Sequence, residues 1–306
     1  MHELDALIPD GAAARDAVTL ASSVSSVKRW TAAGQLVLVH PGVVMLPHLA
    51  EDLLTRARAA NLWAKGPISH TSALELWDVL TPAGGPLHVT VPADRFPRRS
   101  TGVVVHRTTL PLPVSSLGGI QVTTLPRSLV DAWDWAHRSS NGRPHGGGAQ
   151  ARQAVIECLR SRRTDVVAIR RASEAAPVHA GRAELAGLLG LIAGGCESEL
   201  EIWGVTNVLP GPPRLPQWVQ QYAIRLGDGR SVRLDAAYPE ARVAVELDGA
   251  AFHGSRHARE RDLRRDTALA ALGWVVLRFS YARLMADPDG CRREIEAVVR
   301  ARTATR

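Results

Sequence analysis

The chain has 306 residues, of which 45% are hydrophobic, and its formal net charge is +7 with a pI near 10.1. That length allows two domains and a third small one, and the apolar fraction is that of an ordinary globular protein. All but two of the 37 basic residues are arginine, the exceptions being Lys28 and Lys65. A G+C-rich coding sequence explains part of this bias, since Ala, Arg, Val and Gly share such codons. The positive charge also suits a polyanionic partner such as DNA.

Cysteine usage and hydropathy argue against secreted and membrane classes. Cys158, Cys196 and Cys291 are odd in number and far apart, with neither metal-ligand spacing nor a disulfide framework. The first residues lack the positive region and apolar run of a signal peptide. No apolar stretch reaches the ~18 residues that a membrane span needs. We therefore expect a cytoplasmic protein in a reducing environment.

The first 50 residues follow the order helix, turn, helix, hairpin. Helix formers fill residues 12–21, and Ser25 is the expected N-cap of a second helix that ends before Gly34. Two short apolar strands, at 35–39 and 43–46, then flank a His-Pro-Gly turn. This order is the outline of a winged helix. The alternative is a small helical subdomain without a ligand.

If this segment is a winged helix, its second helix enters the major groove of DNA. The residues expected to contact DNA from this helix are Ser25, Ser26, Lys28 and Arg29.

The middle of the chain shows a mixed α/β pattern without a chemical motif. Expected helices cover 50–62 and 126–135, and expected strands cover 86–91, 102–106 and 120–124. The histidines here have no spacing that indicates a metal site or a nucleophile. A structural or interaction module is the better interpretation. A Gly-, Ser- and Arg-rich linker and short arginine-rich helices follow.

The last third of the chain carries the pattern with chemical meaning. Two predicted strands, 231–238 and 243–249, flank a Pro-Glu-Ala-Arg turn. With the second and third of these turn residues at its centre, Asp235 lies directly opposite Glu246. Upstream of this hairpin, a Ser-Glu-Leu-Glu sequence predicts a helix with a capping box that ends on Glu201.

The same register places further charges at the end of the hairpin. Alternation along the strand puts Glu246 and Asp248 on one face and Leu247 on the other, and Arg233 lies opposite Asp248. Opposed carboxylates in an apolar strand repel each other and are costly to bury. A divalent cation removes this conflict, and hard oxygen ligands suit Mg²⁺ or Mn²⁺. The alternative is that Arg233 neutralises Asp248, which then belongs only to an Asp-Gly turn.

A histidine and a basic helix follow the second strand. His253 is a candidate to activate a water molecule. The helix expected over 256–266 carries Arg259 and Arg261, which could contact phosphate or pair within the helix. A buried strand at 273–279 and a helix at 288–302 complete the chain.

The segment that reads RLDAAYPEARVAVELDGAAFH and then RERDLRRDTALAALGWVVLRF, with SELE upstream, resembles a known nuclease group. It is similar to the very-short-patch-repair-like branch of the PD-(D/E)XK endonuclease superfamily. It is more similar still to an endonuclease-like domain family common in actinobacteria. This resemblance covers about a third of the chain, from Cys196 to Arg300.

The resemblance implies a metal site formed by Asp235, Glu246 and the carbonyl of Leu247, assisted by Glu201. His253 occupies the position where the repair endonucleases place a histidine near the attacked phosphate. The superfamily's usual lysine is replaced by Asp248. Charge stabilisation then depends on the metal, His253, or an arginine such as Arg259 or Arg261.

The N-terminal half, with SSVKRWTAAGQLVLVHPGVVMLP, SHTSALELWDVL, LHVTVP and GVVVHRT, resembles the AbiEi-like antitoxins of type IV toxin–antitoxin systems. Those proteins carry a winged-helix DNA-binding region and often repress their own operon. This resemblance implies a cognate toxin or operon partner.

The expected fold class is α/β (α+β). A winged helix occupies 1–50, an AbiEi-like α/β module 51–137, a linker with connecting helices 138–195, and a restriction-endonuclease-like mixed sheet flanked by helices 196–306. The expected function is a DNA-binding, Mg²⁺- or Mn²⁺-dependent endonuclease. The alternative is an antitoxin-like transcriptional regulator whose nuclease-fold domain is inert.

Overall fold

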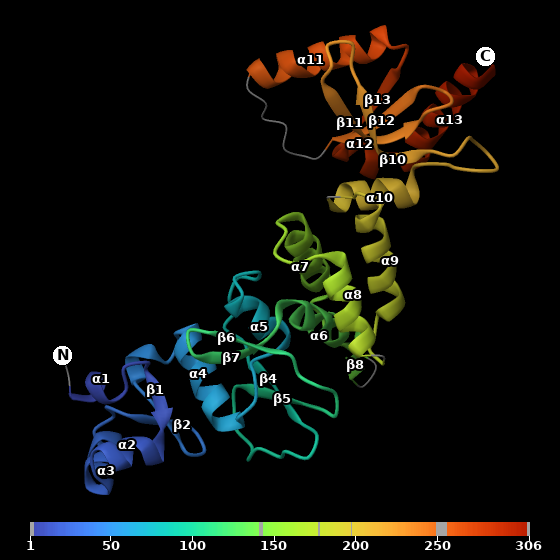
Figure 1. Ribbon diagram of the computed structural model, residues 1–306. Helices are drawn as coiled ribbons and strands as arrows, with labels where there is room; N and C mark the ends of the chain where they lie inside the picture. Colours follow the sequence, from blue (N-terminus) through green and yellow to red (C-terminus); the bar gives the residue numbers. More distant parts are fainter. Residues whose placement is uncertain (1–2, 141–142, 177, 197, 249–255, 305–306) are drawn as a thin grey trace. The chain divides into compact units, whose positions relative to one another are not determined.

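The computed structural model describes residues 3–140, 143–176, 178–196, 198–248 and 256–304 (Figure 1). Contacts divide the chain into two compact units, Met1–Leu185 (the first unit) and Ala186–Arg306 (the second unit). Helices and strands occur in both, and the expected α/β (α+β) class is confirmed. Among the described residues, no helix combines the length and apolar character needed to cross a membrane. All three cysteines are buried free thiols, in line with their spacing.

The first unit begins with three helices and a small antiparallel sheet. Its strands lie in the order β1-β3-β2. Val27 and Trp30 anchor the third helix in a core with Ile8 and Leu36. The elements are α1 (Glu3–Leu7), β1 (Ala12–Ala14), α2 (Arg15–Ala21), α3 (Val24–Ala32), β2 (Val37–His40) and β3 (Val43–Met45).

Two details of this segment differ from the sequence prediction. The alanines of β1 pair with β3 rather than starting a helix, because the sheet ladder overrides their helix propensity. The N-cap of α3 is Ser23, not Ser25: Ser23 has extended backbone angles, and its Oγ accepts the Ser26 N–H at 3.0 Å. Gly34 follows the helix with φ +69°, as predicted for a C′ glycine.

The rest of the first unit packs helices around two strand pairs. β4 and β5 are parallel, and β6 and β7 are antiparallel. Ile68 bridges β4 and β7 through Val89 and Val122, so one buried core serves both pairs. The elements are α4 (Leu53–Ala64), α5 (His70–Leu76), β4 (Leu87–Pro92), β5 (Val103–Thr108), β6 (Val114–Leu117), β7 (Ile120–Thr123), α6 (Leu125–His137), β8 (Ser139–Ser140), β9 (Arg143–Pro144), α7 (Gly148–Arg160) and α8 (Val166–Ala175), with a 3₁₀ turn at Pro47–Leu49.

The division between the units falls within α9 (Arg182–Ala193). The second unit has a four-stranded mixed sheet in the order β10-β11-β12-β13, antiparallel except for the parallel pair β12–β13. Its elements are α10 (Glu199–Asn207), β10 (Val219–Arg225), β11 (Ser231–Tyr238), β12 (Val243–Asp248), α11 (Arg256–Ala271), β13 (Val275–Ser280), α12 (Tyr281–Ala286) and α13 (Pro288–Ala304).

Helices cover both faces of this sheet (Figure 1). One face packs on α10, α12 and α13 through residues such as Leu200, Leu284 and Ile295. The other face packs on α11 through Leu269. Val245 and Ala244, neighbours on β12, face these two cores respectively, as strand alternation requires. A mixed sheet flanked by helices was predicted for this region.

Candidate functional site

The candidate site lies where β11 and β12 separate. Their ladder follows the predicted register through Tyr238↔Val243, Ala237↔Ala244 and Ala236↔Val245. Asp235 and Glu246 lie one step beyond that last pair. There the Leu247 N–H donates to the side-chain Oδ2 of Asp235 at 2.9 Å. The Asp235 carboxylate is thereby fixed against the Leu247 peptide.

Glu246 is almost fully buried, with 6% of its surface exposed. Its Oε1 lies 2.6 Å from Nη2 of Arg265, which projects from α11. The same Nη2 donates to the Arg233 carbonyl at 3.0 Å. A guanidinium therefore supplies counter-charge to a carboxylate for which the sequence predicted a metal ion.

Arg265 is the functional candidate that sequence reasoning missed. It lies in the arginine-rich helix that was interpreted as a phosphate-contacting or self-paired element. Pairing within the helix does occur one residue earlier, where Arg264 Nε lies 3.2 Å from Glu260 Oε1. The signal for Arg265 is its position one turn before the buried Leu269, which places it on the face of α11 that meets the sheet.

A second ion pair joins α11 to the sheet beside Arg265. Asp266 Oδ1 lies 2.7 Å from Nη2 of Arg278, and Arg278 is the β13 residue paired with Glu246 in the parallel ladder. Within the described residues, the Nε atoms of Arg265 and Arg278 are buried without a hydrogen-bond partner. Two arginines, Arg265 from the helix and Arg278 from the sheet, thus lie between α11 and the sheet.

Ser198 is the predicted N-cap of α10, and Glu201 pairs with it. The Glu201 N–H donates to Ser198 Oγ at 3.2 Å, and that hydroxyl donates to Glu201 Oε1 at 2.8 Å. Gln221 Nε2 donates to the other carboxylate oxygen at 3.3 Å. Burial raises the pKa of the Cys196 thiol to about 11, and the charges of Glu201 and Asp235 contribute to the shift. Glu201 and Asp235 therefore share one neighbourhood.

These carboxylates do not form a compact ligand cluster. In the part of the chain that the structure describes, one group of three His, Cys, Asp or Glu side chains has its ligand atoms within 4.8 Å of one another, and it lies in the first unit. Glu201 is not brought within that distance of both Asp235 and Glu246.

Several predicted residues cannot be placed at this site. His253 lies outside the described residues, as do the side chains of Asp248, Arg259 and Arg261. The Leu247 side chain, in contrast to Glu246, packs into the core beneath α10. The two residues are thus on opposite faces of β12, as predicted.

The predicted DNA-contacting residues lie in the first unit, on α3. Ser25, Lys28 and Arg29 are exposed, and Ser26 is half-buried at the helix start. Val27, which lies between Ser26 and Lys28, and Trp30, which follows Arg29, are buried in the core. The helix therefore presents a polar, basic face to solvent.

The match to a known family lies within the second unit. Residues 223–299 match REase_MTES_1575, a restriction endonuclease-like family. The match runs from β10 into α13 and contains Asp235, Glu246, Leu247 and Arg265, while Glu201 lies upstream of it. No curated protein matches the chain. The second unit accordingly contains a nuclease-like domain.

Proposed function

We propose that the protein is a DNA-binding, metal-dependent endonuclease, with its hydrolytic site at the separated ends of β11 and β12. The observation that carries this proposal is the carboxylate pair Asp235 and Glu246, one step beyond the β11–β12 ladder, within a segment that matches a restriction endonuclease-like family. In such a fold, a strand-borne carboxylate pair is positioned to hold a cation against a phosphate.

The donor atoms fit a hard divalent cation. The Asp235 and Glu246 carboxylates and the Leu247 carbonyl all offer oxygen, the ligand that Mg²⁺ and Mn²⁺ prefer. The bond from the Leu247 N–H orients the Asp235 carboxylate at that peptide. A bound ion would polarise the scissile phosphate and lower the pKa of an attacking water.

The remaining roles belong to the chain's own side chains. Arg265 forms an ion pair with Glu246 and can place a positive charge next to a phosphate. In the superfamily a lysine has this role, and that lysine is absent from this chain. His253 is the proposed proton carrier. Arg259 and Arg261 are proposed contacts to the DNA backbone, and Glu201 supports the site through Gln221.

DNA binding is proposed for the winged-helix arrangement of the first 50 residues. The order helix, strand, helix, helix, strand, strand is that of a winged helix, and α3 takes the position of the recognition helix. Its exposed Ser25, Lys28 and Arg29 support this assignment. The basic composition of the whole chain is in keeping with a phosphate-rich partner.

The test is DNA cleavage by the full chain with Mg²⁺ or Mn²⁺. Asp235→Asn and Glu246→Gln keep side-chain size and should each abolish cleavage. Asp228→Asn, which changes a fully exposed carboxylate in the loop after β10, is the matched control and should keep full activity. Cleavage that survives both site substitutions would refute the assignment.

Two observations favour a second candidate, a DNA-binding regulator with an inert nuclease fold. Glu246 already has a cationic partner in Arg265, and Asp248 stands where the superfamily keeps its lysine. This candidate predicts sequence-specific DNA binding unaffected by chelators, and no cleavage with any divalent metal. Saturation binding of Mn²⁺ that is lost in Asp235→Asn would contradict it.

A further inference from the structure

Three histidines from separate elements converge in the first unit. His70 is the first residue of α5, His88 lies on β4 and His106 lies on β5. Each offers one ring nitrogen, and these three atoms lie within 4.8 Å of one another. We refer to them as the histidine cluster.

The backbone fixes this convergence. In the parallel register of β4 and β5, His88 pairs with Val104 and Thr90 pairs with His106, so both histidines project from one face of the pair. The segment before α5 is attached to β4, because the Ser69 N–H donates to the His88 carbonyl at 2.9 Å. The start of α5 is thus held over that face.

Two of the ring nitrogens lie close to the separation that a metal ion requires. His88 Nδ1 and His106 Nε2 lie 2.9 Å apart, with ring planes 15° from parallel, so one proton sits between two nitrogens. Tetrahedral Zn²⁺, with Zn–N bonds of ~2.0–2.1 Å, holds two nitrogens about 3.3 Å apart. Replacing the proton with a metal therefore requires the two nitrogens to separate by a few tenths of an ångström and each ring to turn so that its lone pair points at the ion.

His70 has the outer partner that a metal-binding histidine needs. Its Nδ1 lies 2.9 Å from Ser69 Oγ, and Ser69 Oγ accepts a hydrogen bond from Thr90 Oγ1 at 2.7 Å. In the tautomer in which His70 Nδ1–H donates to Ser69 Oγ, Nε2 is the ligand nitrogen. The His70 ring now stacks on His106 at 3.6 Å, so coordination requires a turn about its Cβ–Cγ bond.

Burial keeps the cluster in the form that binds metals. It lowers the pKa of His88 to about 4 and that of His106 to about 3, and it lowers the pKa of His70 well below its usual value. Neutral imidazole is the metal-binding form, so the proton between His88 and His106 has only to move to the other nitrogen of its ring. His70 also has φ +55°, an uncommon angle for a non-glycine residue.

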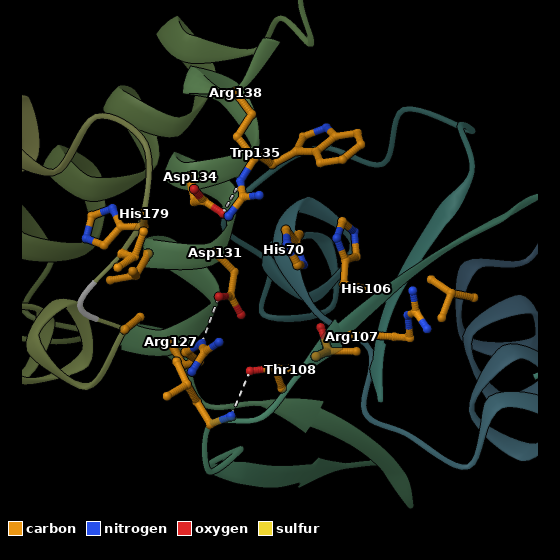
Figure 2. Close-up of a pocket in the computed structure, with 16 residues that line it drawn as sticks. His70, His106, Arg107, Thr108, Arg127, Asp131, Asp134, Trp135, Arg138 and His179 are labelled. Atoms are coloured by element: carbon orange, nitrogen blue, oxygen red, sulfur yellow. Dashed lines mark hydrogen bonds and ion pairs between the residues drawn. The ribbon is translucent and has the colours of Figure 1, made fainter. Parts of the chain in front are cut away.

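The cluster opens on a pocket of about 440 Å³. Figure 2 shows Arg127, Asp131 and other polar residues of α6 on one side of it, with His70 and His106 opposite. Asp131 has only 7% of its surface exposed, and its Oδ2 has no hydrogen-bond partner among the described residues. A buried acceptor of this kind calls for a donor such as water or a bound ligand.

We propose that the histidine cluster binds one zinc-class transition-metal ion, with a coordination position open to this pocket. Three imidazoles select Zn²⁺, Co²⁺ or Ni²⁺ over Mg²⁺, which prefers oxygen. Three protein ligands and a fourth exchangeable one is the arrangement of reactive rather than purely structural zinc sites. The proposal is independent of the nuclease site, which lies in the second unit and uses oxygen ligands.

The test uses the chelator-treated full chain in an Asp235→Asn background, which silences the proposed nuclease site. Titration with Co²⁺ should give visible ligand-field absorption that saturates at one equivalent, and Zn²⁺ should displace it. His106→Gln should remove the absorption. His179→Gln changes a histidine that lines the same pocket without belonging to the cluster, and it should bind Co²⁺ normally.

Ser69→Ala tests the positioning of His70 without removing a ligand. It should weaken Co²⁺ affinity by roughly 10–100-fold while keeping one-equivalent stoichiometry. Thermal unfolding of each metal-free variant shows whether it is folded. The proposal is overturned if the folded chain binds no Co²⁺, or if His106→Gln binds it as tightly as its parent.

Discussion

Arg265 provides the counter-charge of Glu246 in the nuclease-like site. It contacts the most buried carboxylate of the site, and its own side chain is only 25% exposed. An ion pair at this depth stabilises little in itself, but removing one partner leaves a charge without compensation. A divalent cation could take over that compensation, so the two cations are alternatives for Glu246.

Arg265→Met should destabilise the metal-free second unit by about 3 kcal/mol, because the buried Glu246 loses its counter-charge. Mn²⁺ should recover much of this loss and stabilise the variant more than the wild type. Chemical denaturation with and without Mn²⁺ measures both effects. Arg264→Met, which breaks an exposed pair with Glu260, should change stability by less than about 0.5 kcal/mol. Equal Mn²⁺ stabilisation of variant and wild type would show that Arg265 and metal do not compete.

Asp131 should make stability depend on pH. Burial raises its pKa from 3.8 to about 6, although Arg127 donates to it at 2.7 Å and opposes the shift, while Asp134 adds to it. The folded chain therefore holds this proton more tightly, and the resulting stabilisation is full below pH 3.8 and lost as pH rises through about 6.

Asp131→Asn lacks this pH-dependent loss. The variant's stability relative to wild type should rise by about 2 kcal/mol between pH 4 and pH 7. Urea denaturation of both proteins at the two pH values measures it. The histidines that line the same pocket titrate in both proteins, so their contribution cancels in the difference between variant and wild type. A stability difference that does not change with pH would contradict the assigned pKa of Asp131.

At the level of elements, local patterns predicted the β11–β12 hairpin and its register. A four-residue turn and alternating apolar residues define which positions face each other. The Ser198 N-cap was predictable for the same reason, since it involves residues three apart. α5 and β10 were missed because their hydrophobic periodicity is weak and their formation depends on packing against β4 and β11.

The contact between α10 and β12 gives an element-scale prediction. A Cβ on Gly204 would lie 2.5 Å from Leu247 Cδ1, so the glycine lets α10 approach the strand that carries Glu246. Gly204→Ala should destabilise the second unit by about 1 kcal/mol, because overpacking outweighs the gain in helix propensity. Gly187→Ala in α9 meets nothing within 4 Å and should be neutral or stabilising. Thermal unfolding of the two variants measures the difference. A stabilising effect of Gly204→Ala would mean that Leu247 can move to accommodate the added methyl group.

The basic residues of α3 give a second element-scale prediction, which concerns DNA binding. The double substitution Lys28→Ala/Arg29→Ala in the full chain should weaken DNA binding. The plot of the logarithm of the binding constant against the logarithm of the salt concentration should become less steep by about two, one for each lost phosphate contact. Arg170→Ala/Arg171→Ala removes the same charge from the exposed residues of α8 and is the control. Fluorescence anisotropy across a salt series measures both. An equal effect of the two substitutions would assign the binding to general charge rather than to α3.

At the scale of the whole molecule, the two candidate metal sites differ in how far sequence could reveal them. Asp235 and Glu246 lie eleven positions apart along one hairpin, so their proximity follows from local pairing. The histidine cluster joins a helix start to two parallel strands, and a parallel register depends on the tertiary fold. Its residues carried no metal-ligand spacing, and only the assembled first unit brings them together.

Because the proposed sites lie in different compact units and use different donor atoms, two metals should stabilise different parts of one chain. Calorimetry of the full chain should show two transitions, with Zn²⁺ raising the one that depends on His106 and Mn²⁺ raising the one that depends on Asp235. A metal at 100 times its Kd contributes about 2.7 kcal/mol, enough to shift a transition by several degrees. His106→Gln should cancel only the Zn²⁺ shift and Asp235→Asn only the Mn²⁺ shift. A single transition that both metals move, whichever residue is substituted, would contradict the assignment of one site to each unit.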